Sequence, residues 1–399
     1  MAIGRGGSKP GGGGKRDSGG KPGAAKAPQV LIANPDNEPW HALPGSDAVR
    51  AERLDEAKTS ALRASAEPLF EKEVAAWEAQ KALTETGDDR YMQQVLRSGT
   101  LADKVAAMTL LVLESPVHRL ATLDKLLATA KSGKHTAKMA IESLKDFFGG
   151  AGGLPGARRL APLASRPPLS ESPPPAHQVL WLFEERLAER YGGFLDVVAG
   201  YLKHSAVELR RFAAETCAAL LKAKPEKEAE LLALLVNKLG DPQPKVAARA
   251  ATLLTEVLRE HRAMTAVVVA EVQGFCARAK ADPGARRAAV AFLNQVFLTK
   301  GLADVAASLV RMYLALFVAA VDAGELQTKL LAALLLGVNR ALPYAPPGAL
   351  DAGAAAPEVD ALFGLAHAGT GPARVQALQL LERLCRGGDD KLKARFQRA

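Results

Sequence analysis

The segment from Leu231 to Leu258 constrains the fold most strongly, because it places two apolar helices on either side of a tight turn. The first helix has one broad apolar face, formed at helical spacing by leucines 231, 232, 234, 235 and 239. Gly240 is expected to end that helix in the left-handed conformation, and Asp241 to accept hydrogen bonds from the next helix. Pro242 is expected at the first position of that next helix. Such a pair of helices cannot bury both faces alone and needs neighbours.

The same pattern recurs along the second half of the chain. Each unit of the pattern has a small residue four positions after its first residue and, in most units, a Leu-like residue eight positions after it. The units start at Leu209, Val246, Ala285, Lys329 and Ala373. The starts are 37 to 44 residues apart, and a period near 40 with two helices per unit is typical of HEAT and armadillo arrays. Aromatic residues make up only 5% of the chain, which favours helices packed through small side chains. The sequence therefore predicts an all-α, HEAT/armadillo-like solenoid, whose concave surface would bind a large partner.

Composition divides the chain into five parts. Residues 1–29 hold six of the lysines and arginines against one acidic residue, so more than half of the net charge of +9 lies there. This part has almost no large apolar side chains, and we expect a disordered basic tail. The other predicted parts are an N-terminal helical region at 30–148, a Gly/Pro-rich loop at 149–176, HEAT-like repeats at 177–386 and a C-terminal tail at 387–399. Within the helical region, the apolar segment around Trp40 is expected to dock onto the body.

Motifs for catalysis or cofactor binding fail on inspection. The segment GGGGKRD has Arg16 where a phosphate-binding loop needs Ser or Thr. Cys217, Cys276 and Cys385 lie far apart, which predicts reduced core thiols and no zinc site. The first ten residues, MAIGRGGSKP, lack an apolar signal region, and no uninterrupted apolar run approaches the ~18 residues of a membrane span. We expect a soluble intracellular protein that is no enzyme, uses no cofactor and contacts no membrane.

Clustered basic residues suggest a nucleic-acid interface. Lys238 and Lys245 flank the turn described above, and three basic pairs lie elsewhere: Arg158-Arg159, Arg210-Arg211 and Arg286-Arg287. Such cations neutralise phosphates and give salt-dependent binding. The alternative is structural, because helix C-termini favour cations and Lys or Arg solvates a helix face. No aromatic residues alternate with these cations for base stacking, and no zinc-finger or basic-zipper pattern is present.

Several segments occur in an order that points to a known family: KPEKEAELLALLVNKLGDPQPKVAARAATLL, VVVAEVQGF, FLNQVFLT and TKLLAALLLGVNRALPYA. The chain resembles the CCAAT-binding-factor family from residue 30 to about residue 384, most specifically in LVNKLGD and GVNRALPYA. The resemblance implies a non-catalytic, helical-repeat scaffold for assembly of the large (60S) ribosomal subunit in the nucleolus. Its implied partners are pre-ribosomal RNA, the pre-60S particle and a homologue of nucleolar complex protein 2.

The family name also records a role in transcription, so binding to DNA at CCAAT elements is one alternative function. A transport or adaptor solenoid with no nucleic-acid role is another. Family members continue well beyond the point where this chain stops, at RGGDDKLKARFQRA. We therefore expect a C-terminally truncated member of the family, in which partner sites from the other half are missing.

Two asparagines end Leu-rich helices in similar contexts. Asn237 precedes Lys238, and Asn339 precedes Arg340. In the structural interpretation each Asn bonds to groups at the helix end. In the functional one, Lys238 and Arg340 present charge from one edge of the solenoid to RNA or an acidic partner, so replacing both with Glu would leave thermal stability nearly unchanged. The neighbouring turn residues are expected to be structural: Gly240, Asp241, Pro242, Pro343 and Tyr344.

Overall fold

The computed structural model describes residues 29–32, 34, 38–133, 136–278, 282–323, 329–346, 356–368, 371–387 and 396–397. Within these ranges the chain forms fifteen α-helices and seven short 3-10 helices and no strand, which confirms the predicted all-α class. The predicted basic tail lies outside the described residues except for its last residue, and most of the predicted C-terminal tail does too. The 3-10 helices are η1 (Trp40–Ala42), η2 (Leu163–Ser165), η3 (Leu169–Glu171), η4 (Lys238–Gly240), η5 (Arg262–Met264), η6 (Lys300–Leu302) and η7 (Leu342–Tyr344).

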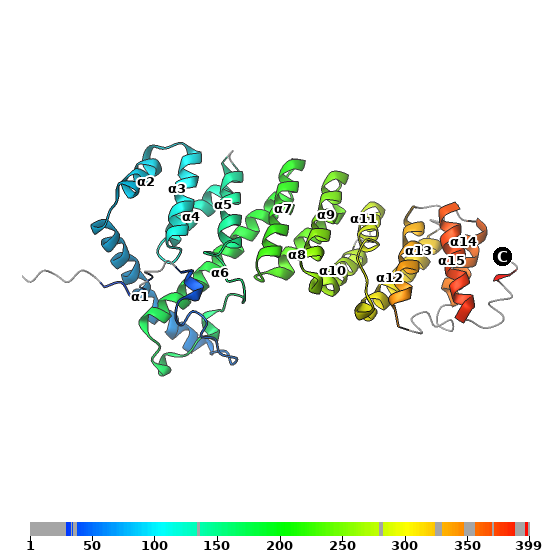
Figure 1. Cartoon of the computed structure of the whole chain (residues 1–399), viewed down its shortest axis with the longest axis horizontal. Helices are drawn as coiled ribbons and strands as arrows, with labels where there is room; N and C mark the ends of the chain where they lie inside the picture. Colours follow the sequence, from blue (N-terminus) through cyan, green and yellow to red (C-terminus); the bar gives the residue numbers. More distant parts are fainter. Residues whose placement is uncertain are drawn as a thin grey trace, which may run out of the picture.

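Thirteen of the helices stack in two layers and form an elongated array (Figure 1). The first layer holds α3 (Leu101–Glu114), α5 (Ala137–Gly149), α7 (Val207–Ala223), α9 (Pro244–Glu260), α11 (Pro283–Leu293), α13 (Lys329–Ala341) and α15 (Gly371–Gly387). The second layer holds α4 (Leu120–Lys131), α6 (Pro175–Leu202), α8 (Glu228–Asn237), α10 (Thr265–Arg278), α12 (Ala303–Asp322) and α14 (Ala356–Ala368). Each helix contacts its neighbours in its own layer. This arrangement is compatible with a helical solenoid.

The repeat pattern of the sequence corresponds to one layer. The five predicted starts fall in α7, α9, α11, α13 and α15, which are successive helices of the first layer. The array also extends further towards the N-terminus than the predicted start at residue 177, because α3 to α6 stack in the same two layers. The long connection between α5 and α6 interrupts the period, so the sequence pattern does not show this unit. The assignment to the HEAT or armadillo type stays a prediction.

The Gly/Pro-rich segment predicted as a loop at 149–176 packs into the body. It lies against α6 and α1 (Glu56–Leu83), and Arg166 in it is fully buried in an ion pair with Glu184 of α6. Trp40 is also buried, and its indole Nε1–H donates to the carbonyl of Gly153 at 2.7 Å. The segment around Trp40 therefore docks onto the body, as the sequence predicts. The remaining helix, α2 (Gly87–Ser98), contacts α3 at the N-terminal end of the array.

The turn between α8 and α9 differs from its sequence prediction in two respects. Gly240 lies in η4 and has no positive φ, so left-handed freedom does not explain it. Instead, a Cβ at this position would come within 2.9 Å of Phe275 Cζ, so glycine permits a close approach of α10. Pro242 is not the first helical residue either, because Pro244 begins α9. The side chain of Asp241 accepts a hydrogen bond from the backbone N–H of Gln243 at 3.0 Å, so this N–H group, just before α9, has a partner.

One helical segment, Lys300–Asp322, is long and apolar enough to cross a membrane by length and composition. Its apolar run is interrupted by Arg311, as the sequence shows, but the helix continues through that residue. In the array α12 packs against α10, α13 and α14, and its side chains Tyr313 and Phe317 are buried. It is therefore a core helix of the array. The three cysteines are buried in the core, as predicted.

Candidate nucleic-acid interface

The array has two edges, formed by the two sets of turns between its layers. At the edge that we call the basic edge, the turns α6–α7, α8–α9 and α10–α11 lead from the second layer to the first. The ammonium of Lys238 donates to the carbonyl of Leu202 at 2.7 Å, which joins the ends of α8 and α6. Asp241 of the α8–α9 turn and Asp282 of the α10–α11 turn line one groove, so these two turns also lie side by side. Six predicted site residues lie at this edge: Arg210, Arg211, Lys238, Lys245, Arg286 and Arg287.

Two of these cations are held inside the fold by Asp241. Its carboxylate Oδ2 lies 3.0 Å from Arg210 Nε and 3.0 Å from Lys238 Nζ. The side chains of Arg210, Lys238 and Asp241 are only 10%, 15% and 1% exposed. Burial alone raises the pKa of Asp241, but the hydrogen bonds from Gln243, Lys238 and Arg210 outweigh it and hold this pKa below its usual value. Arg210 and Lys238 therefore have a structural role, but in a buried ion-pair cluster and not on the solvated helix face that the sequence left open as an alternative.

Two of the other four predicted cations of the basic edge are exposed. Lys245 and Arg287 are exposed, and neither forms an ion pair with another described residue. Arg286 is half-buried, and Arg211 is paired with Glu208 at 3.1 Å. Lys203, which is not among the predicted site residues, is exposed at the end of α6. Lys203 lies in the turn before α7, at a position equivalent to that of Lys238 before α9. This equivalence could have predicted it from the sequence.

The three remaining predicted cations lie at the opposite edge. Arg158 bonds the buried carboxylate of Glu184, with one nitrogen–oxygen distance of 3.1 Å. Arg159 pairs with Glu228 at 2.8 Å, beside the turn between α7 and α8. Arg340 is exposed near the end of α13. The structure therefore does not bring these three arginines together with the basic edge.

The two asparagine motifs also separate. Asn237 ends α8 at the basic edge and is exposed, whereas Asn339 lies near the end of α13 and is buried. The side-chain amide of Asn339 donates to the carbonyl of Gln376 in α15 at 3.1 Å. Because α8 and α13 belong to different layers, Lys238 and Arg340 end at opposite edges. The functional interpretation, in which both residues present charge from one edge, therefore does not fit this arrangement. After Asn339, Pro343 and Tyr344 lie in η7, and Tyr344 is 37% exposed.

Among the described residues, no group of three His, Cys, Asp or Glu side chains could hold a metal ion. The basic edge instead presents basic side chains at helix ends. The arrangement can neutralise phosphate groups along several consecutive turns.

Comparisons with known proteins identify the chain's relatives. No family model matches the chain. CCAAT/enhancer-binding protein zeta of Mus musculus is 31% identical over 363 residues, which cover 88% of this chain and 34% of the relative. Ribosome biogenesis protein NOC1 of Chaetomium thermophilum is 30% identical over 413 residues, covering 89% of this chain and 39% of the relative. The chain is a homologue of these proteins.

A third homologue is nucleolar complex protein 1 of Drosophila melanogaster, which is 30% identical over 309 residues. That alignment covers 74% of this chain and 26% of the relative. The resemblance that the sequence motifs indicate is thus confirmed at the level of named homologues. The chain spans about a third of the length of the curated relatives it matches.

Proposed function

We propose that the chain is part of a non-catalytic ribosome-biogenesis factor that acts as a scaffold in assembly of the large (60S) subunit. The names of two relatives, ribosome biogenesis protein NOC1 and nucleolar complex protein 1, support this role and a nucleolar location in the nucleus. A HEAT-like solenoid suits it, because an extended array of helix pairs presents a long surface to a large particle. In this proposal the basic edge binds pre-ribosomal RNA.

The position of the cations on their helices carries the RNA-binding proposal. Lys245 lies in the first turn of α9, and Arg286 and Arg287 lie near the start of α11. The helix dipole disfavours a cation at an N-terminus, so the structural explanation for cations at C-termini does not apply here. The positive end of the helix instead adds to the charge of the side chain, and both attract phosphate. Lys203 in the preceding turn extends the positive surface by one helix pair.

A charge-reversal experiment tests this interface. In Lys245→Glu/Arg287→Glu, two exposed cations of the basic edge are inverted. The matched control, Arg262→Glu/Lys300→Glu, inverts one exposed arginine and one exposed lysine at the opposite edge. Binding is measured by fluorescence anisotropy with a labelled fragment of large-subunit precursor RNA at several salt concentrations.

The proposal predicts that Lys245→Glu/Arg287→Glu binds RNA at least tenfold more weakly, with a salt slope reduced by about 2. The control variant should bind much as the unmodified chain does. Equal losses in both variants would mean that only overall charge matters. No loss in the first variant would refute the assignment of the basic edge.

The proposed protein partners are the pre-60S particle and a homologue of nucleolar complex protein 2. A pull-down with the tagged chain from nucleolar extract, with sequencing of crosslinked RNA, tests both. Recovery of nucleolar complex protein 2 together with large-subunit precursor RNA would support the proposal. Recovery of neither by a folded chain would count against this segment as the binding region.

The name of the mouse relative favours a second candidate, binding to CCAAT elements in DNA. That function predicts tighter binding to a CCAAT duplex than to a scrambled duplex at physiological salt. Equal binding to the two duplexes would exclude sequence-specific recognition by this segment. A generic adaptor solenoid, in turn, predicts that no RNA is recovered after crosslinking.

A further inference from the structure

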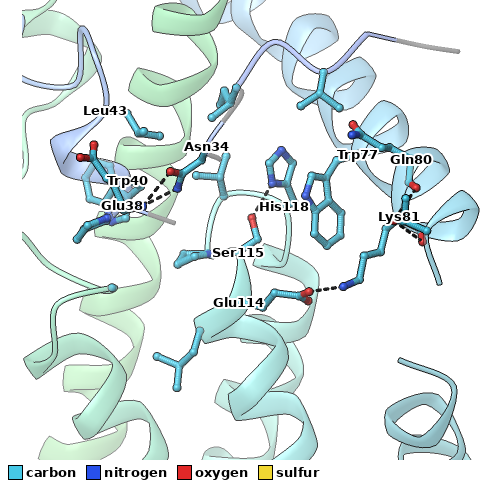
Figure 2. Close-up of a pocket in the computed structure, with 18 of the residues that line it drawn as sticks. Asn34, Glu38, Trp40, Leu43, Trp77, Gln80, Lys81, Glu114, Ser115 and His118 are labelled. Carbon is cyan, nitrogen blue, oxygen red and sulfur yellow. Dashed lines mark hydrogen bonds and ion pairs between the residues drawn. The ribbon is translucent and has the colours of Figure 1, made fainter. Parts of the chain in front are cut away.

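A cleft of about 1070 Å³ opens at the N-terminal end of the array, away from the basic edge. Figure 2 shows it between the N-terminal segment, the end of α1 and the turn that joins α3 to α4. Trp40 and Trp77 line it together with His118, Ser115 and Lys81. Its volume is at the upper limit of the roughly 300–1,000 Å³ typical of small-molecule pockets, so it can hold several side chains of a peptide.

The walls of the cleft are fixed by specific contacts. The buried carboxylate of Glu73 accepts hydrogen bonds from the backbone N–H groups of Leu31, at 2.6 Å, and Ile32, at 2.9 Å. Glu73 Oε1 also lies 3.2 Å from His118 Nε2, and His118 stacks on Trp77 with 4.9 Å between ring centroids. The N-terminal segment is thereby held against α1 and the α3–α4 turn. A ligand would therefore meet a preformed surface, which lowers the entropic cost of binding.

Large apolar side chains are exposed at the mouth of the cleft. Leu83, at the end of α1, is 77% exposed, and Leu113, near the end of α3, is 47% exposed. Both line the cleft. Leu110 is 55% exposed and lies three residues before Leu113, so it continues the apolar surface along α3. Exposed apolar side chains gathered at a cleft are typical of interaction sites.

The charges in the cleft disfavour a nucleic acid and favour a cation. Lys81 is the one lysine or arginine among the described residues that line it. Its ammonium is already bound by Glu114 (Figure 2) and, at 2.9 Å, by Asp89. Glu38 also lines the cleft and is exposed. With two carboxylates and a single paired ammonium, the cleft has a negative balance in a chain whose net charge is +9.

We propose that this cleft binds a segment of a partner protein that presents apolar side chains next to a lysine or arginine. The apolar side chains pack between Leu83 and Leu113, and the cation faces Glu38 and Glu114. Apolar anchors near the centre of an interface and charges at its rim are the usual division of roles in protein recognition. This site is separate from the basic edge, so the two surfaces can be occupied together.

The test uses defined probes and a matched variant. The probe is a fluorescein-labelled decapeptide with alternating pairs of Leu and Lys; two controls are the same peptide with Glu in place of Lys and a labelled ten-nucleotide oligouridine. Each is titrated against the unmodified chain, against Leu113→Asp and against Leu336→Asp. Leu336 is a matched control because it is 41% exposed on α13, far along the array.

The proposal predicts that the Leu/Lys peptide binds the unmodified chain and Leu336→Asp alike, and binds Leu113→Asp at least tenfold more weakly. It also predicts at least tenfold weaker binding of the Leu/Glu peptide. Equal binding of the two peptides, or unchanged binding to Leu113→Asp, would overturn the proposal. Competition by oligouridine, or a dimer of the chain that Leu113→Asp dissociates, would assign the surface to another occupant. If Leu113→Asp does not give the native circular dichroism spectrum, Leu83→Asp replaces it, because Leu83 is more exposed.

Discussion

Replacing Asp241 with Asn tests the structural role of the buried ion pairs at the α8–α9 turn. The substitution keeps the size of the side chain and its acceptor for the Gln243 N–H, but it removes the charge that faces Arg210 and Lys238. Loss of one partner of a buried ion pair costs about 3–5 kcal/mol. Because the two basic side chains keep 10% and 15% exposure, water recovers part of this, and we expect a loss of about 2–4 kcal/mol.

The assay is urea unfolding followed by circular dichroism, with Asp196→Asn as the control. Asp196 is exposed on α6 and has no ion pair with another described residue, so its replacement should change the free energy of unfolding by less than about 0.5 kcal/mol. Hydrogen exchange should also accelerate locally in the first turns of α7 and α9. A loss in Asp241→Asn no larger than that of the control would refute the reasoning, because the ion pairs would then contribute nothing measurable.

Three further predictions concern stability. Gly240→Ala should cost about 1–3 kcal/mol, measured by the same unfolding assay, because the new Cβ would lie 2.9 Å from Phe275 Cζ. Lys238→Glu should lower the melting temperature by placing a second carboxylate beside Asp241, whereas Arg340→Glu should leave it unchanged; equal melting temperatures would contradict this. The pKa of Glu73 is held low: burial raises it, but hydrogen bonds from His118 and two backbone N–H groups outweigh that effect. Ionised Glu73 therefore stabilises the fold above pH 4.5, its pKa in the unfolded chain, and this stabilisation is lost as pH falls through its lower pKa in the folded chain. Tryptophan fluorescence should report release of the N-terminal segment on acidification. Glu73→Gln should abolish this pH dependence.

The repeated helix pairs could be predicted from sequence because each unit buries an apolar face at regular spacing. The starts at Leu209 and Val246 fall in α7 and α9, as the pattern indicates. The earlier helix pairs, α3 to α6, were not predicted as repeats because the segment before α6 shows no such period. That segment is ordered by contacts distant in sequence, such as the buried pair of Arg166 and Glu184, which periodicity does not reveal.

The candidate site could be predicted only in part. Local composition identifies Lys245 and Arg287 as basic residues near turns, and both are exposed at the basic edge. It does not show which cations are neutralised, because the partner of Arg210 is Asp241, 31 residues away. Nor does it show the layer of each helix, which places Arg340 at the opposite edge. The N-terminal cleft depends on contacts between segments that are far apart in the chain.

The most direct test of the central claim is ultraviolet crosslinking of the chain to large-subunit precursor RNA, followed by mass spectrometry of the crosslinked peptides. If the basic edge binds RNA, crosslinks within the array should lie at its turns, in residues 203–211, 238–249 and 283–291. Crosslinks confined to the turns of the opposite edge, in residues 222–230, 259–264 and 294–302, would contradict it.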